Sequence, residues 1–417
     1  MANHTISWKR LPIVELCEAH VDCVNRTAPV VSGPTPYKML RTTNVRNGYV
    51  DADHVRYVTE ETFKKWTRRL VPKRGDIILT REAPLGDVGK IRTDDHVFLG
   101  QRLYHFRPDP SVLNADYLLY ALLGVDLQSQ IRGFGSGSTV EHMRLEDIPS
   151  LEFNVPPLPV QQRIAGILSA YDDLIENSQR RIKILESMAR ALYREWFVNF
   201  RFPGHEGLLR VASPLGEIPK GWEVKKLADL CESVSYGYTA SASREEVGPK
   251  FLRITDIVPD HINWVGVPYC QIPEDKASKY LLRPGDIVVA RTGATTGYAK
   301  RLNKRHPETV FASYLVRVRA GAGVSNRMLG ILMESDSYKQ FVNTNIGGAA
   351  QPQANAVVLT SMRVAAPTPS VADKFDQLVE PLLDECELLA AKIQNLRHTR
   401  DLLLPRLLSG QIDVEVA

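Results

Sequence analysis

The side chains best suited to bind a polar ligand lie in two loops that the chain contains twice. The first loop is 80–86 in one copy and 291–297 in the other; the second is 132–139 in one copy and 347–355 in the other. Glycines let the backbone approach a ligand, arginine can address a phosphate or guanine, and Gln and Asn can pair with adenine. Gly-Ser loops are also common hairpin turns, so an ordinary connection remains the alternative. The candidate ligand-binding residues are Arg74, Arg81, Arg132, Ser136, Ser138, Thr139, Arg291, Thr292, Thr295, Gln351, Gln353 and Asn355.

These loops belong to a repeat that spans almost the whole chain of 417 residues. Segment 40–45 returns as 252–257, an offset of 212, and Gly75-Asp76-Ile77 returns as Gly285-Asp286-Ile287, an offset of 210. A long internal repeat indicates two copies of one structural unit, which suits a ligand with two similar halves. The loops differ more than the framework does, which predicts two different half-sites.

Charge and composition narrow the class of ligand. The net charge is only +4, but nine basic residues lie between 64 and 92 against three acids, and eight lie between 283 and 319 against two. Two basic patches are what two phosphate-backbone contacts would need, although they could also serve solubility. Five scattered cysteines indicate neither a disulfide framework nor a zinc site, and no apolar run is long enough to cross a bilayer. We therefore expect a cytoplasmic protein without a membrane segment.

The chain divides into four parts: a mixed domain at 1–155, a helical region at 156–204, a second mixed domain at 205–366 and a second helical region at 367–417. Region 116–127 predicts one amphipathic helix in the first mixed domain. In the helical regions, apolar residues recur every 3.5 positions from Ile164 to Trp196, and again 211 residues later, where nine of ten positions are apolar and Arg400 is the exception. This period is typical of a coiled-coil seam.

The expected fold is α+β, with two pseudo-symmetric mixed α/β domains separated by two long antiparallel coiled-coil helices. The helix pair would hold the domains at a fixed spacing. Pro381 should kink or restart the second helix, and Pro405 should stop it, because proline removes a backbone donor and clashes with the preceding turn.

Two segments give the chain a specific resemblance. Residues 156–165 read PPLPVQQRIA and open the first long helix, and residues 400–410 read RDLLLPRLLSG and close the second. Both resemble the conserved regions of type I restriction–modification specificity subunits, and the order of domains and helices is similar over the full length.

The resemblance implies a non-catalytic subunit whose two target-recognition domains read the two halves of a bipartite site in double-stranded DNA. The helices would set the unread spacer and dock two methyltransferase subunits, with restriction/translocase subunits completing the complex. The partners would use S-adenosylmethionine, ATP and Mg, and this chain would hold no cofactor. On the helices, Arg180, Arg181 and Arg190 are candidate partner contacts.

Two other classes of function remain open. An intrinsic DNA methyltransferase or nuclease is disfavoured because 133–137 does not match G-x-G-x-x-G and a valine interrupts the Asn-Pro-Pro-like segment 154–158. We therefore predict no catalytic residue and no metal ligand. A coiled-coil assembly scaffold that does not read DNA would explain the helices but would leave the two basic patches without a role.

Overall fold

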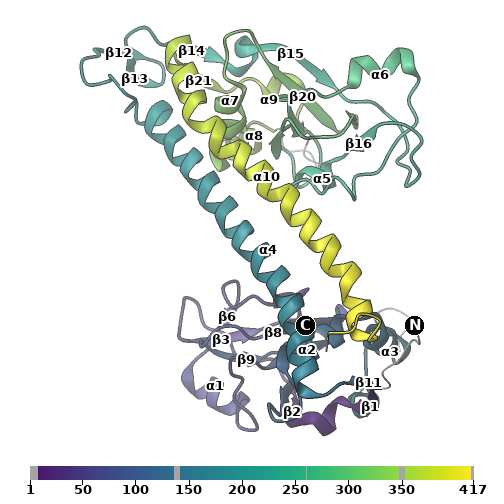
Figure 1. Cartoon of the computed structure of the whole chain (residues 1–417). Helices are drawn as coiled ribbons and strands as arrows, with labels where there is room; N and C mark the ends of the chain where they lie inside the picture. Colours follow the sequence, from purple (N-terminus) through teal and green to yellow (C-terminus); the bar gives the residue numbers. More distant parts are fainter. Residues whose placement is uncertain (1–7, 136–140, 260, 347–352, 415–417) are drawn as a thin grey trace. The chain divides into compact units, whose positions relative to one another are not determined.

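The computed structural model describes residues 8–135, 141–259, 261–346 and 353–414. Contacts divide the chain into two units: unit 1 comprises 1–176 and 394–417, and unit 2 comprises 177–393. Each unit contains one mixed domain and one part of each long helix (Figure 1). The order of elements in unit 1 returns in unit 2, as the sequence repeat predicts.

Unit 1 is built around a six-stranded sheet with the strand order β2-β10-β7-β8-β5-β4. The apolar residues of β7 are buried on both faces, because α2 and α3 cover one face while the smaller sheet β6-β3-β9 covers the other. Strands β1 and β11 form a separate antiparallel pair. The strands of unit 1 are β1 Lys9–Pro12, β2 Cys17–Asp22, β3 Tyr37–Leu40, β4 Val45–Arg46, β5 Gly48–Val50, β6 Arg56–Tyr57, β7 Ile77–Arg81, β8 Leu85–Lys90, β9 His96–Leu99, β10 Leu103–Pro108 and β11 Glu152–Val155. Its short helices are α1 Glu60–Trp66, α2 Ala115–Leu123 and α3 Val125–Gly133, with 3-10 turns at Ile13–Leu16, Thr42–Asn44 and Leu145–Ser150.

Unit 2 repeats the central part of this sheet as β15-β20-β17-β18, and β14 pairs with β21 as β1 pairs with β11. A parallel pair, β16-β19, takes the place of β3-β9, and the hairpin β12-β13 precedes the domain. The strands of unit 2 are β12 Arg210–Ser213, β13 Gly216–Pro219, β14 Glu223–Lys226, β15 Cys231–Tyr236, β16 Lys250–Leu252, β17 Ile287–Ala290, β18 Ala299–Arg301, β19 Thr309–Phe311, β20 Leu315–Ala320 and β21 Arg363–Ala366. Its short helices are α5 Ile254–Ile257, α6 Glu274–Tyr280, α7 Asn326–Met333, α8 Asp336–Asn345 and α9 Ala356–Leu359, with a 3-10 turn at Leu227–Leu230.

The repeated Gly-Asp-Ile segment has a structural role in both units. The buried carboxylate of Asp76 accepts the backbone N–H of Lys73 (2.8 Å) and pairs with Arg107 on β10 (2.7 Å). In unit 2, Asp286 and Arg319 form the same buried pair, also at 2.7 Å. Burial alone would raise the pKa of Asp76, but hydrogen bonds from Arg107 and His105 outweigh it and hold that pKa below its usual range. The motif therefore fixes the turn before the central strand.

The single helix predicted at 116–127 is wrong, because the structure has two helices, α2 and α3, separated at Gly124. Gly124 is extended, with ψ of 155°, which ends α2 and starts α3 in a new direction. A β-carbon at this position would lie 2.7 Å from Cδ1 of Leu408, so the close approach of α10 explains the glycine.

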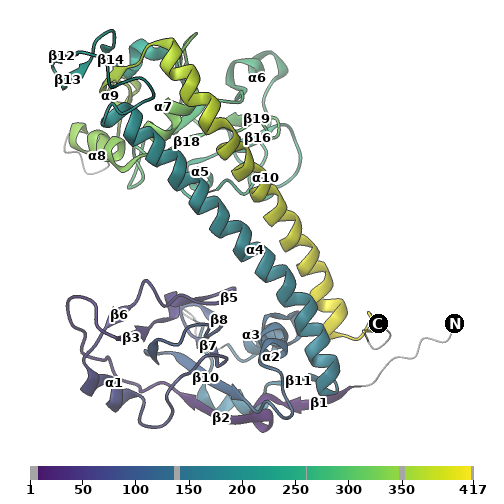
Figure 2. The same ribbon diagram turned by 60° about the vertical axis from the view of Figure 1, so that its left-hand side comes forward.

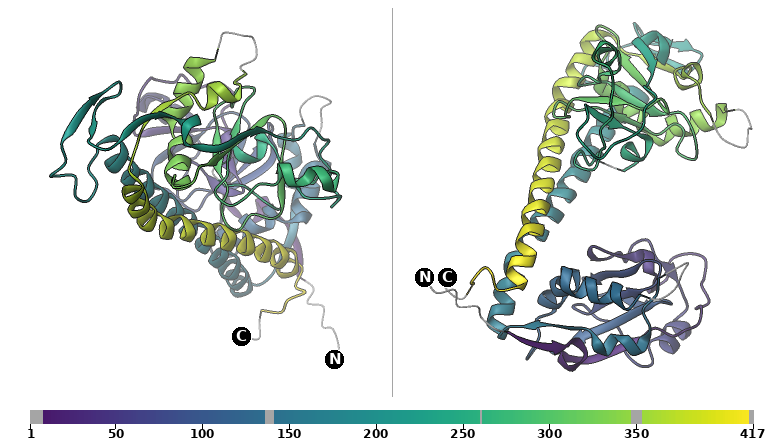
Figure 3. Two further views of the ribbon diagram at one scale, coloured as in Figure 1. Left: turned by 90° about the horizontal axis from the view of Figure 1, so that it is seen from above. Right: turned by 90° about the vertical axis from the view of Figure 1, so that its right-hand side faces the viewer.

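The two predicted long helices are α4, Leu158–Tyr193, which ends in a π-helical turn at Arg194–Val198, and α10, Pro369–Leu408. Within unit 1, Arg163 contacts Val414 and Asp172 pairs with Arg400. Within unit 2, Arg181 pairs with Glu385 and the ring of Trp196 packs on that of Phe375, so in each unit the residue numbers run in opposite directions. The predicted seam residues are buried or half-buried, which confirms an antiparallel coiled coil within each unit. Figures 2 and 3 show the two helices side by side.

Two expectations about α10 are wrong, a restart of the helix at Pro381 and its stop at Pro405. The helix is continuous through Pro381 and extends three residues beyond Pro405. Each proline removes one i→i−4 hydrogen bond, but burial of neighbouring seam residues such as Phe375, Val379 and Leu407 stabilises the helix around the gap. The polar seam residue Arg400 is neutralised by the buried Asp172, with 2.5 Å between Nη1 and Oδ1.

All five cysteines are free thiols. The thiols of Cys17 and Cys231 donate to the carbonyl oxygens of Ile13 and Leu227 at matching places in the two units. Burial raises the pKa of Cys231 to about 11, so this thiol stays protonated near neutral pH. In the described ranges, no helix combines the length and apolar character that crossing a bilayer requires.

Candidate nucleic-acid interface

In unit 1 the first predicted loop contacts residues just beyond the second predicted loop, 132–139, through the backbone of Arg81. The N–H of Met143 donates to the carbonyl oxygen of Arg81 (2.9 Å), and Glu82 and His142 form an antiparallel bridge. The N–H of Arg81 donates to the carbonyl oxygen of Arg102 (2.8 Å), in the turn before β10. Three segments that are distant in sequence therefore meet at one residue.

Unit 2 builds the same junction around Arg291. Its carbonyl oxygen accepts the N–H of Ala354 (2.8 Å), its N–H donates to the carbonyl oxygen of Tyr314 (3.0 Å), and Thr292 bridges Gln353. Each bond has its counterpart in unit 1 at an offset of 210 to 212, since 291 − 81 = 210, 354 − 143 = 211 and 314 − 102 = 212. In unit 2 the structure thus brings the two predicted loops together, whereas in unit 1 the residues that contact Arg81 and Glu82 follow the predicted loop 132–139.

The side chains of the two junction arginines are partly committed within the protein. The Nη1 of Arg81 donates to the carbonyl oxygen of Met143 (2.9 Å), and the guanidinium of Arg291 lies 4.9 Å from the centre of the Tyr236 ring. In both arginines Nε is buried and has no hydrogen-bond partner within the described ranges. Each guanidinium is therefore held in place, with part of its donor capacity unused.

Two further predicted ligand-binding residues, Arg74 and Thr295, make contacts within the protein. Arg74 is exposed and pairs with Asp94 (2.9 Å), and Thr295 accepts the N–H of Tyr298 through its backbone carbonyl oxygen (3.0 Å). Arg81 belongs to the end of β7 rather than to a loop, so the connection between β7 and β8 is shorter than 80–86.

The second loops are only partly described. Arg132 lies in the last turn of α3 rather than in the predicted loop 132–139, and its side chain is exposed. Gln353 is exposed, whereas Oδ1 of Asn355 caps α9 by accepting the N–H of Val358 (2.9 Å). Four predicted residues lie outside the described ranges: Ser136, Ser138, Thr139 and Gln351.

Much of the charge in the two basic patches is neutralised within the protein. Five of the nine basic residues in the first patch form ion pairs, namely Lys64, Arg69, Arg74, Lys90 and Arg92. In the second patch, Arg301 and Lys304 contact the α10 acids Glu387 and Glu380. These contacts fasten the domain of unit 2 to its helix, so net basic charge alone overstates the surface available to phosphates.

Sequence reasoning missed four residues of the junctions: Glu82, Arg102, His142 and Tyr314. Arg102 and Tyr314 come from a third segment, the turn between β9 and β10 and its counterpart between β19 and β20. A signal was present, because positions 102 and 314 are separated by the repeat offset of 212. Only the structure shows that this turn contacts the two loops.

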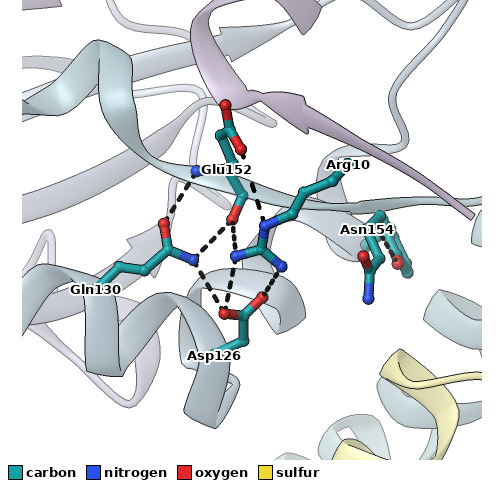
Figure 4. Close-up of polar contacts among 6 residues, drawn as sticks. Arg10, Asp126, Gln130, Glu152 and Asn154 are labelled. Carbon is teal, nitrogen blue, oxygen red and sulfur yellow. Dashed lines mark hydrogen bonds and ion pairs between the residues drawn. The ribbon is translucent and has the colours of Figure 1, made fainter.

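Figure 4 shows how unit 1 anchors the helix that leads into its second loop. Arg10 of β1 forms two hydrogen bonds with the carboxylate of Asp126 on α3 (2.9 and 3.0 Å). Gln130 exchanges two hydrogen bonds with the backbone of Glu152 on β11 (2.7 and 3.1 Å). Because both contacts lie on α3, they fix the position from which residues 134 and 135 leave the helix.

The candidate partner contacts on α4 have neighbours in the same unit. Arg181 pairs with Glu385 of α10 (2.7 Å), and Arg190 pairs with Glu186 one turn away (3.5 Å). Arg180 is exposed. Near them, Ile184 and Met188 are 53% and 47% exposed, although both are large apolar residues. An apolar pair one helical turn apart is a surface that a partner helix could cover.

Comparisons with known proteins agree with this architecture. Residues 8–187 match the family described as the type I restriction modification DNA specificity domain. The chain is 27% identical over 369 residues to the type I restriction enzyme MjaIX specificity subunit of Methanocaldococcus jannaschii, covering 86% of this chain and 82% of that protein. It is 22% identical over 415 residues to the type I restriction enzyme HindI specificity subunit of Haemophilus influenzae, covering 82% and 87%. The crystal structure of a type I restriction-modification system S subunit from M. genitalium shares the fold, with a TM-score of 0.59 at 14% identity over 98% of this chain and 97% of that one.

Proposed function

We propose that this chain, a specificity subunit of a type I restriction–modification system, recognises a bipartite, asymmetric site in double-stranded DNA. The observation that carries the proposal is the junction built twice, around Arg81 and around Arg291, with the same backbone hydrogen bonds and different exposed side chains. A protein that recognises two different half-sites needs different side chains at corresponding positions of the same backbone framework.

The helices have two roles in this proposal. Helix α4 is continuous from Leu158 to Tyr193 and contributes residues to both units, so its length would set the unread spacer between the half-sites. Its exposed face would dock a methyltransferase subunit, with Ile184 and Met188 as contacts in unit 2. Two methyltransferase subunits and the restriction/translocase subunits would supply the chemistry, together with S-adenosylmethionine, ATP and Mg.

The docking surface is testable without DNA. Replacing both Ile184 and Met188 with Glu should lower the number of methyltransferase subunits that co-purify with the chain from two to one, because it places two charges in the apolar contact of unit 2. Lys183→Glu changes an exposed charge on the same helix and should leave co-purification intact. Normal co-purification of the double variant would remove this face from the interface.

One observation favours a scaffold that does not read DNA: many basic residues of the two patches are paired within the protein. The two functions differ in a direct measurement. The purified chain should bind duplex DNA with an affinity that falls as salt rises, and it should transfer no tritium from S-adenosylmethionine to DNA until methyltransferase subunits are added. A scaffold would show no salt-dependent DNA affinity, and transfer by the chain alone would indicate an enzyme.

A further inference from the structure

Three exposed or half-exposed positions surround each junction arginine, and they correspond between the units. In unit 1 they are Glu82, Arg102 and His142; in unit 2 they are Thr292, Tyr314 and Gln353. We call each set a reading triplet. We propose that the two triplets select bases in the two half-sites, whereas Arg81 and Arg291 make a contact that is common to both. This inference rests on the proposed function and names the residues that give it specificity.

Within a junction, the arginine and the triplet are suited to different parts of the DNA. Contacts to phosphate fix the position of a protein on DNA and carry no sequence information, whereas contacts to base edges do. Arg81 and Arg291 are the same residue type on the same backbone, with the same buried Nε. A residue shared by both copies cannot distinguish two half-sites, so the phosphate backbone is its natural target.

The backbone geometry of the triplets is the same in the two units, whereas the chemistry of their side chains differs. Glu82 and His142 occupy the same antiparallel bridge as Thr292 and Gln353. Arg102 and Tyr314 each accept the N–H of the junction arginine through the backbone carbonyl oxygen, which leaves their side chains free of that task. The side chain of Arg102 is 52% exposed, and Tyr314 is 60% exposed. Exposed side chains on fixed backbone are suited to reading base edges in a groove.

The triplet of unit 2 carries no charge, and its chemistry fits an A·T pair. The amide of Gln353 can donate to N7 and accept from N6 of adenine in the major groove when its donor and acceptor are oriented toward that edge. The methyl group of Thr292 and the ring of Tyr314 can contact the C5-methyl group of thymine, which is the apolar group that an A·T pair presents in the major groove. We therefore assign an A·T pair of the second half-site to Gln353.

The triplet of unit 1 is charged and fits a G·C pair. Glu82 and Arg102 form an ion pair of 3.0 Å, which restricts the orientation of the Arg102 guanidinium. A held guanidinium can donate two hydrogen bonds to O6 and N7 of guanine, and a carboxylate can accept from N4 of cytosine. We therefore assign a G·C pair of the first half-site to Arg102.

The test uses the complex of this chain with its methyltransferase subunits and a library of randomised duplexes, sequenced after methylation. Gln353→Ala should relax one A·T position in one half-site, with a loss of discrimination of roughly 5- to 150-fold, the range expected for one bidentate pair. Arg102→Ala should relax one G·C position in the other half-site. Gln377→Ala, at an exposed glutamine on α10, should leave every position as selective as in the parent chain.

Arg291→Ala gives the contrasting result. It should weaken binding evenly across sequences and reduce the salt slope of the affinity by about one, with no relaxed base position. If Gln353→Ala abolishes methylation, anisotropy of the variant chain on matched and mismatched duplexes gives the same comparison, and Thr292→Val provides a second, nearly isosteric change in the triplet.

The inference is overturned if the triplet variants fold, retain binding and keep the selectivity of the parent at every position, or if Arg291→Ala alone relaxes a base. Failure of the proposed function has a different signature, because the parent complex would then select no two-part motif. A two-part motif that none of the triplet variants changes would reject the triplets and leave the proposed function intact.

Discussion

At the scale of single residues, the repeated aspartates show that a motif found in both halves of the chain can stabilise the framework rather than bind the ligand. Asp76 is buried between Arg107 and His105, and its pKa is held below its usual range. An acid with a lowered pKa in the folded state stabilises the protein above its ordinary pKa, and this stability is lost as pH falls through the folded value.

Asp76→Asn should therefore lower the free energy of unfolding by about 3–5 kcal/mol near neutral pH, because it leaves buried positive charge without its partner. The difference from the parent should begin to shrink below about pH 4, where the aspartate of the unfolded chain takes up a proton, and it should be lost as pH falls through the lowered pKa of the folded state. Denaturant unfolding at several pH values measures it. Asp94→Asn, in an exposed pair with Arg74, should have little effect at any pH. A deficit for Asp76→Asn that stays constant down to pH 2 would contradict this role.

The sequence pattern identified segments of the candidate site, but not the residues that contact them. The loops at 80–86 and 291–297 could be chosen because glycine, arginine and a repeat offset coincide there. Arg102 and Tyr314 could not, because a contact between a turn and a distant loop depends on strand order rather than on local pattern. For the same reason, a count of basic residues does not show which of them form ion pairs, as Arg107 does with Asp76.

At the scale of elements, the coiled-coil seam was predictable because burial of one helix face imposes a period that the sequence must carry. The continuous path of α10 through Pro381 was not, since tertiary packing outweighs the local preference of a single residue. The same limit applies to Gly124, because the close approach of Leu408, which explains a glycine at the break between α2 and α3, depends on tertiary packing.

The buried pair of Asp172 and Arg400 is the polar exception in the seam, and Tyr120 of α2 also donates to Asp172 (2.7 Å). This network joins both helices to the domain of unit 1. Arg400→Leu alone should cost about 3–5 kcal/mol of unfolding free energy, because it leaves the buried Asp172 without its charged partner. Asp172→Leu should cost less, because Arg400 keeps its pair with Asp401 (2.8 Å).

The double variant should be closer to the parent in stability than either single variant, since two leucines remove both charges and fill the seam. Tyr120→Phe removes only one hydroxyl and should cost about 1 kcal/mol. A double-mutant cycle by denaturant unfolding provides the comparison. Strictly additive losses would show that the two charges do not depend on each other.

At the scale of the whole molecule, the proposal that the two long helices set the spacer makes a prediction. The preferred spacer length of the DNA site should change with the length of the helices. One heptad can be inserted in each helix where the two units meet, a copy of residues 177–183 after Glu176 in α4 and a copy of residues 387–393 after Ile393 in α10. No contact within either unit is lost by this change, and the seam keeps its register.

Seven residues lengthen a helix by about 10 Å, which corresponds to about three base pairs of B-DNA. The preferred spacer should grow by about that number, with both half-site sequences unchanged, when duplexes with graded spacers are methylated in competition. An insertion in α4 alone breaks the pairing of the helices and serves as the control that should lose activity. An unchanged spacer preference in the matched variant would show that partner subunits, rather than the helices, place the domains.

The central claim is that one chain reads two different sequences and leaves the bases between them unread. A base-resolution map of adenine methylation, in a host that expresses this chain with its methyltransferase subunits, tests it most directly. The account predicts methylated adenines within a motif of two unlike specified blocks separated by an unspecified spacer of constant length. A single contiguous motif, or a methylation map that is the same in a host without this chain, would contradict it.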